Sequence, residues 1–195
     1  MILALLLAAA APVDAPASTR SLYLQLIHQA RADGRPRAAL AYLDDFDRRY
    51  PGDPDARALR VNSLLDLGDV DGAESAAANL HDNAMRGHLL AARNRWSEAV
   101  PLYRAAIAAS PADPLLRNAL GYALLRAGKA DQAIEPLRAA IDLAPADRVI
   151  RNNLLLALTI AGHGAEAEAM LRHVPEQASL RRQLAAQASQ LQKAP

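Results

Sequence analysis

The sequence contains few residues whose types and spacing could perform chemistry. Gly121 and the pair Gly128-Lys129 resemble part of a phosphate-binding loop, in which backbone N–H groups and a lysine hold phosphate oxygens. The spacing differs from that of the motif, and Ala130 occupies the position where the motif needs Ser or Thr. We therefore interpret these glycines as structural residues.

Two other groups of side chains have metal-binding chemistry. Asp66, Asp69 and Asp71 lie close together as in a calcium loop, but their offsets differ and the closing acidic residue is missing. Such positions are typical of a turn and a helix N-terminus, where Asp caps free N–H groups. His81 and His88 could share one helix face, but no third ligand is nearby. We predict no metal, no cofactor and, because neither a Gly-x-Ser-x-Gly nor a His-Glu-x-x-His motif occurs, no enzymatic activity.

The composition indicates which elements must position the remaining side chains. Alanine and leucine supply 46 and 32 of the 195 residues, whereas Val, Ile and Thr together supply 15. Because Ala and Leu favour helices and β-branched residues favour strands, the sequence predicts an all-α fold. The absence of cysteine excludes disulfides and thiolate metal sites. A net charge of +1 gives no overall field that would attract nucleic acid.

The sequence repeats itself at a period of 34 residues. In each copy a glycine or asparagine precedes an alanine by five residues, and the alanines are 34, 26, 34 and 34 residues apart. The pairs are Gly34 and Ala39, Gly68 and Ala73, Asn94 and Ala99, Gly128 and Ala133, and Gly162 and Ala167. A proline follows three of these alanines by twelve residues, at Pro51, Pro111 and Pro145. The pattern predicts a helix–turn–helix array with one shortened copy.

This repeat resembles that of the tetratricopeptide repeat family. The family's Leu-Gly, turn Gly, Ala, large apolar, Ala and Pro positions match, in order, Leu120-Gly121, Gly128, Ala133, Leu137, Ala140 and Pro145. The resemblance implies five repeats at about 20–53, 54–80, 81–113, 114–147 and 148–175. Their antiparallel helix pairs are expected to stack over residues 18–175 into a right-handed superhelix with a continuous core. Residues 176–195 then form an amphipathic C-terminal capping helix and tail.

Physical chemistry explains the residue types at these positions. Small residues such as Gly121 and Ala133 let two helix axes approach closely where the helices cross. Leu124 and Leu137 are expected to fill the space beside that crossing. Gly128 ends the first helix of its pair, where the backbone turns left-handed at least cost in glycine.

Residues 1–17 have the features of a signal peptide. An unbroken apolar run spans residues 2–11 and is shorter than the roughly 20 apolar residues that a membrane-spanning helix needs. Ala15-Pro16-Ala17 supplies small residues at the spacing that a signal peptidase recognises. We therefore expect an exported protein that is periplasmic or associated with the outer membrane.

In a stacked array the first helix of each pair lines the concave groove. The groove-facing positions hold most of the polar side chains of these Ala- and Leu-rich helices, namely His28, Arg31, Asn62, Asp66, His88, Asn118, Tyr122, Arg126, Asn152 and Thr159. Because side-chain amides both donate and accept hydrogen bonds, we predict that the groove binds a protein partner. The alternative is that these side chains are only solvated. The family's carboxylate clamp is incomplete, because Ala84 and His88 stand where it needs cations.

A narrower resemblance concerns the C-terminal part. The segment Arg151-Asn-Asn-Leu and the later segment Leu180-Arg-Arg-Gln-Leu are similar to the tail of the repeat proteins that accompany Flp/Tad pilus machines. This resemblance implies a non-enzymatic scaffold of the cell envelope that helps an outer-membrane secretin assemble. Many of those proteins are lipoproteins, whereas this chain has no cysteine to acylate. Two alternatives stay open: an accessory subunit of an envelope enzyme that acts on peptidoglycan or exopolysaccharide, and a self-associating structural array.

The expected crossing and groove make a testable pair of substitutions. Ala133→Leu should overpack a close helix crossing and lower the free energy of unfolding by about 1–3 kcal/mol. Tyr122→Ala should leave the fold largely intact and weaken partner binding, because Tyr122 is expected to face the groove. Thermal unfolding of both variants checks this prediction. Equal destabilisation by the two changes would show that the assignment of groove positions is wrong.

Overall fold

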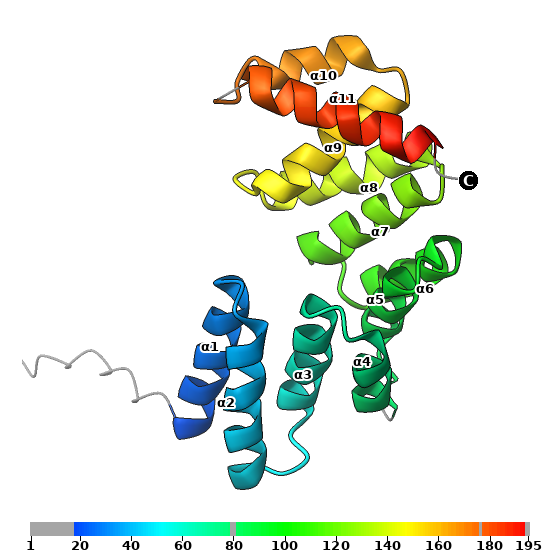
Figure 1. Cartoon of the computed structure of the whole chain (residues 1–195). Helices are drawn as coiled ribbons and strands as arrows, with labels where there is room; N and C mark the ends of the chain where they lie inside the picture. Colours follow the sequence, from blue (N-terminus) through cyan, green and yellow to red (C-terminus); the bar gives the residue numbers. More distant parts are fainter. Residues whose placement is uncertain (1–17, 79–80, 176, 194–195) are drawn as a thin grey trace, which may run out of the picture. The chain divides into compact units, whose positions relative to one another are not determined.

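The computed structural model describes residues 18–78, 81–175 and 177–193, and all regular structure in those segments is helical (Figure 1). The all-α prediction is therefore confirmed. The predicted signal peptide lies outside the described residues. The helices are α1 (Thr19–Ala32), α2 (Pro36–Arg49), α3 (Pro54–Asp66), α4 (Val70–Ala77), α5 (Asn83–Ala92), α6 (Trp96–Ala109), α7 (Pro114–Arg126), α8 (Ala130–Leu143), α9 (Arg148–Ile160), α10 (Gly164–Leu171) and α11 (Gln177–Lys193).

A short polar side chain begins the first helix of every pair. Asp53, Asp82, Asp113 and Asp147 precede α3, α5, α7 and α9, and each carboxylate accepts hydrogen bonds from backbone N–H groups of the first turn. Ser18 does the same for α1. These side chains satisfy donors that have no partner within the helix, so they fix where each first helix starts.

A left-handed residue ends each first helix and turns the chain into the second. Gly128 has a φ of 72°, and the following Lys129 N–H donates to Leu124 O over 2.9 Å. Asn94 replaces glycine in the third copy and still adopts a φ of 59°, with Arg95 N–H bonded to Leu90 O over 2.8 Å. These bonds are those of a helix-terminating turn that requires positive φ, which glycine adopts best and asparagine tolerates. The predicted equivalence of Asn94 with the repeat glycines is confirmed.

Residues without bulk allow the helices to cross closely, as predicted. A Cβ atom built on Gly121 of α7 would overlap the side chain of Leu137 on α8, lying 2.7 Å from its Cδ2. The same hypothetical atom on Gly87 of α5 would lie 2.8 Å from Cε1 of Tyr103 on α6. Ala133 is fully buried at its own crossing. A large side chain of the second helix therefore occupies the space that a glycine leaves on the first.

The chain divides into two compact units after Leu67. The first unit contains α1, α2 and α3, and α3 packs against both preceding helices. Its core consists of Ile27, Ala30, Ala39, Leu43, Phe46, Ala56 and Leu59. The ring of Tyr23 meets Phe46 edge to face at a centroid separation of 6.0 Å.

The second unit contains α4 to α11. Each of α6 to α9 packs against the next helix in the chain. The core of this unit includes Leu124, Leu137, Leu154, Leu155 and Leu158. The C-terminal helix α11 lies on α9 and buries Leu184 and Ala188 there (Figure 1). Arg181 of α11 also forms an ion pair with Glu168 of α10. The predicted capping helix is therefore confirmed.

The shortened second copy divides its two helices between the units. Helix α4 has eight residues, whereas α2, α6 and α8 have fourteen, so the predicted loss of its last turns is confirmed. Helix α4 buries only Ala73 and Ala77. The described residues form one hydrophobic cluster in each unit. The expected continuity of the core from one unit to the next stays a prediction.

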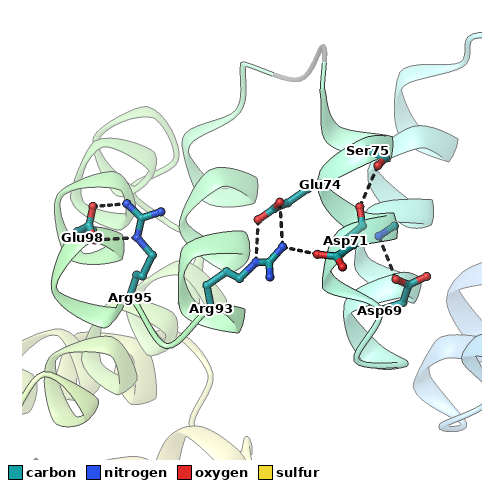
Figure 2. A network of polar contacts seen from close by, with 8 residues as sticks. Asp69, Asp71, Glu74, Ser75, Arg93, Arg95 and Glu98 are labelled. Atoms are coloured by element: carbon teal, nitrogen blue, oxygen red, sulfur yellow. Dashed lines mark hydrogen bonds and ion pairs between the residues drawn. The ribbon is translucent and has the colours of Figure 1, made fainter.

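Polar contacts join α4 to the following helix pair (Figure 2). The guanidinium of Arg93, just after α5, donates to both carboxylate oxygens of Glu74 at 3.1 Å and pairs with Asp71. These hydrogen bonds lower the pKa of Glu74. Asp69 caps α4 by accepting from Gly72 N–H at 2.9 Å. The predicted capping role of this acidic cluster is confirmed at Asp69, while Asp71 binds an arginine.

The close crossing at Gly121 makes a second prediction. Gly121→Ala should lower the free energy of unfolding by about 1–3 kcal/mol, because the new methyl group overlaps the buried Leu137. Gly164→Ala is the matched control, because a Cβ atom at this first residue of α10 meets nothing within 4 Å. The control should be neutral or stabilise by up to about 1 kcal/mol. Urea unfolding of both variants measures the difference, and equal stabilities would contradict the packing described here.

Candidate functional site

The second unit carries a pocket of about 370 Å³ lined by four helices. Its residues are His88 and Ala91 from α5, Trp96 and Tyr103 from α6, Asn118, Ala119 and Tyr122 from α7, and Val149 and Asn153 from α9. Of the predicted partner-binding residues, the structure thus brings His88, Asn118 and Tyr122 together. We call this pocket and its extension the second-unit groove.

The extension is an adjoining pocket of about 310 Å³ that shares Tyr122 and Asn153 with the first. Arg126 and Leu156 line it from α7 and α9, and α11 contributes Gln187, Gln190 and Leu191. From the first pocket to its extension, the lining residues lie progressively closer to the C-terminal ends of both α7 and α9. The groove therefore runs along both helices. The C-terminal helix therefore forms one wall of the groove as well as covering the core.

Tyr103 reaches the groove from the second helix of its pair because Gly87 leaves space beside it. Its hydroxyl oxygen lies 3.0 Å from Nδ1 of His88, and the two rings are 5.3 Å apart. Burial raises the pKa of Tyr103 above its ordinary value. The hydroxyl group therefore stays protonated at neutral pH and is available to donate to His88.

Trp96, Tyr122 and Arg126 form a stacked cluster in the groove. The rings of Trp96 and Tyr122 meet edge to face at 5.7 Å, and the guanidinium carbon of Arg126 lies 4.5 Å from the centre of the Trp96 ring. Nη1 of Arg126 also donates to the Tyr122 hydroxyl at 3.4 Å. All three side chains are half-buried. A cation over an aromatic ring is attracted to it, so the cluster holds the arginine in one place.

An amide pair crosses the floor between α7 and α9. Nδ2 of Asn153 donates to Oδ1 of Asn118 over 2.8 Å. We predicted that Asn152, one repeat after Asn118, faces the groove. The structure instead turns the next residue toward Asn118, since adjacent residues of a helix point about 100° apart. Oδ1 of Asn152 is buried and has no hydrogen-bond partner among the described residues.

The predicted residues of the first unit gather at a separate site. His28, Arg31 and Asp66 line an open pocket of about 580 Å³ with Gly34 and neighbouring residues. Arg31 and Asp66 form an ion pair across it, with Nη2 and Oδ2 2.9 Å apart. The charges of these two side chains therefore largely neutralise each other.

Two predicted residues, in addition to Asn152, lie outside both sites. Asn62 is half-buried on α3 and does not line the pocket of the first unit. Thr159 of α9 donates its hydroxyl proton to Leu155 O at 2.8 Å and lines a smaller pocket between α9, α10 and α11. Neither residue contributes a side chain to the second-unit groove.

Sequence reasoning missed the groove residues supplied by second helices and by the cap. Trp96 and Tyr103 were not among the predicted groove residues, and the C-terminal helix was predicted only as an amphipathic cap. The scarcity of aromatic residues is a usable signal, because the whole chain has one Trp, one Phe and five Tyr. Three of these seven aromatic residues lie together in the groove.

Comparison with a known family model explains this architecture. The tetratricopeptide repeat model matches residues 24–84 and again residues 84–148, which together exceed half of the chain. The chain belongs to the tetratricopeptide repeat family. The predicted family is thereby confirmed, and the matched segments contain α1 to α8 almost completely.

Solved structures of tetratricopeptide repeat proteins have the same fold. A thermophilic protein of Thermus thermophilus, TTC0263, superposes with a TM-score of 0.70 at 22% identity, over 90% of this chain and 100% of that one. PilF of Pseudomonas aeruginosa gives a TM-score of 0.62 at 19% identity, over 78% and 73% of the two chains. YrrB, described as having an unusual peptide-binding site, gives 0.53 at 17%, over 86% and 90%. No curated protein matches this sequence.

The described residues contain neither a metal-ligand cluster nor a membrane-spanning helix. Within them, no three His, Cys, Asp or Glu side chains cluster closely enough to hold a metal ion. Among the described helices, none is both long and apolar enough to span a bilayer.

The buried tyrosine of this tetratricopeptide repeat groove makes a pH-dependent prediction. Because the folded state raises the pKa of Tyr103, it favours the neutral phenol, and this contribution is fully present below the ordinary pKa near 10. The free energy of unfolding should then fall as pH rises above about 10, and it should fall less steeply in Tyr103→Phe. Urea unfolding between pH 8 and 11 measures both slopes, with Tyr42→Phe as the control. Parallel slopes for all three proteins would contradict the burial of this hydroxyl.

Proposed function

We propose that the chain is a non-enzymatic interaction scaffold that binds a partner protein in the second-unit groove. Proteins of the tetratricopeptide repeat family are generally interaction scaffolds, so the family supports this class of function. The observation that carries the proposal is the composition of the groove. Trp96, Tyr122 and Arg126 belong to the residue types that contribute most to protein interfaces, and here they lie next to one another.

The geometry of the groove suits an extended peptide segment. The Asn118–Asn153 pair uses one donor and one acceptor, and each amide has further hydrogen-bonding groups for a peptide backbone. The pocket that contains this pair is otherwise lined largely by apolar and aromatic side chains, and the adjoining pocket adds Leu156 and Leu191 among polar groups. Amides beside apolar and aromatic surfaces combine backbone recognition with side-chain selection, as a peptide-binding surface requires.

We further propose that the protein is exported and acts in the bacterial cell envelope, with a component of a Flp/Tad pilus system as its partner. The partner favoured by the sequence is the outer-membrane secretin. The two segments similar to the pilus-associated repeat proteins lie on α9 and α11, which pack against each other. These two helices also supply Asn153 and Gln187 to the groove. The part of the chain that carries the resemblance is thus the part that lines one side of the proposed binding surface.

A photo-crosslinking experiment tests this proposal. A benzophenone amino acid replaces Tyr122 in the full chain, the cells are irradiated, and envelope fractions are analysed by mass spectrometry. We expect capture of a secretin or another pilus component, in a fraction outside the cytoplasm, by a chain that has lost residues 1–17. Arg104 is the matched control position, because it lies exposed on α6 away from the groove lining.

Other products would redirect or overturn the proposal. Specific capture of an envelope enzyme from position 122 would favour an accessory subunit, and crosslinks only to a second copy would favour a structural array. Equal capture from positions 122 and 104 would overturn the assignment of the groove. Recovery of the full-length chain only from the cytosol would overturn export.

A further inference from the structure

We infer that the second-unit groove selects a segment with an acidic side chain, whose carboxylate binds Arg126. This inference rests on the proposed function, and it defines the chemistry of the partner rather than its name. It also commits to a carboxylate within the partner chain, on an Asp or Glu side chain.

Arg126 is held in position without a carboxylate partner. Its guanidinium lies over Trp96, and its polar contact is the long hydrogen bond to the Tyr122 hydroxyl. None of the ion pairs formed by the described residues includes Arg126. A guanidinium group carries five N–H donors in a planar fork, so most of them are available to a ligand.

Neighbouring arginines of the same unit differ in this respect. Figure 2 shows Arg93 bound to Asp71 and Glu74, and Arg95 bound through Nε and Nη2 to Glu98. Those two cations are neutralised within the chain. By contrast, the described lining of both pockets of the groove contains no Asp or Glu side chain. The groove therefore presents a positive charge that an acidic ligand complements.

The surroundings of Arg126 strengthen its attraction for a carboxylate. The side chain is half-buried over the rings of Trp96 and Tyr122, and Leu191 of α11 adds apolar surface to the same pocket. Gln187 and Gln190 add amide donors to the same pocket. A charge-assisted hydrogen bond is stronger at such a site than on an open surface, because less water competes for the donors.

The opposite end of the groove is apolar. Its distance from Arg126 sets how far apart an apolar and an acidic residue of the ligand must lie. Val149 lines that end and is 64% exposed. Leu115, the equivalent residue one repeat earlier, is 63% exposed and precedes the lining residue Asn118 by about one turn of α7. Eleven residues of α7 separate Leu115 from Arg126, which corresponds to roughly 16 Å at a rise of about 1.5 Å per residue. An extended peptide spans that length in about five residues. The expected ligand therefore has a large apolar residue about five positions away from an acidic one.

Peptide display identifies the preference directly. A library of random twelve-residue peptides, flanked at both ends by linker so that every carboxylate is internal, is selected against the full chain. We expect enrichment of peptides that carry an apolar residue and, about five positions away, Asp or Glu. Selection against Arg126→Gln should lose the acidic preference, whereas selection against Arg104→Gln should keep it. Both variants remove one positive charge, and urea unfolding checks that both are folded.

Affinity is then measured for the most enriched peptide, synthesised without tryptophan. Trp96 is the sole tryptophan of the chain, so its fluorescence reports occupancy of the groove. Replacing the acidic residue of the peptide by its amide should weaken binding at least about tenfold in the wild-type protein and have little effect in Arg126→Gln. Arg126→Lys should recover part of the affinity, because it keeps the charge but loses the fork.

The outcomes separate the inference from the proposed function. Enriched peptides that change Trp96 fluorescence but show no acidic preference would overturn the inference and leave the groove as a binding site. An acidic preference that persists in Arg126→Gln would also overturn it. A parallel library with free C-termini that alone yields binders would assign Arg126 to a terminal carboxylate instead. Failure of both libraries to enrich any peptide would count against the proposed function itself.

Discussion

The second unit depends on the close approach of paired helices at positions where the first helix has no side chain. At Gly121 the neighbouring Leu137 occupies the volume that a Cβ atom would need, and at Gly87 the ring of Tyr103 does so. Because interiors are close-packed, such a crossing tolerates neither a gap nor an added methyl group. It fixes the distance between the two helices of a pair and thereby the positions of the residues on their outer faces.

The same constraint builds the groove. The space left by Gly87 lets the Tyr103 side chain extend from the second helix to His88, where its buried hydroxyl contacts this groove residue. In this repeat, the contact between Gly87 and Tyr103 therefore belongs to the core and also positions a residue of the groove. The cluster of Trp96, Tyr122 and Arg126 completes the surface with contacts between successive pairs, from α6 to α7.

The sequence predicts well what depends on local chemistry. Turn residues, the aspartate at Asp69 and the glycine at the crossing each act through neighbours a few residues away or through one fixed repeat spacing, so the pattern identifies them. Asn94 could be assigned as a turn residue because asparagine, among residues with a side chain, tolerates positive φ. The shortened copy is visible as a spacing of 26 residues in place of 34.

Features that depend on how helices face each other could not be obtained in this way. Whether Asn152 or Asn153 meets Asn118 depends on the rotation of α9 against α7, and a one-residue error changes the direction of a side chain by about 100°. The contribution of α11 depends on where the cap packs, which no repeat spacing describes.

The brevity of α4 has a consequence for local unfolding. Its two buried methyl groups contribute only roughly 1–2 kcal/mol of apolar stabilisation, at about 0.8 kcal/mol each. Arg93 also forms exposed ion pairs with this helix, and salt screens such pairs. Longer helices such as α7 and α8 bury five or more residues each. The backbone amides of α4 are therefore the ones expected to exchange with solvent deuterium through local opening, at a rate set by ionic strength rather than by the global stability of the unit.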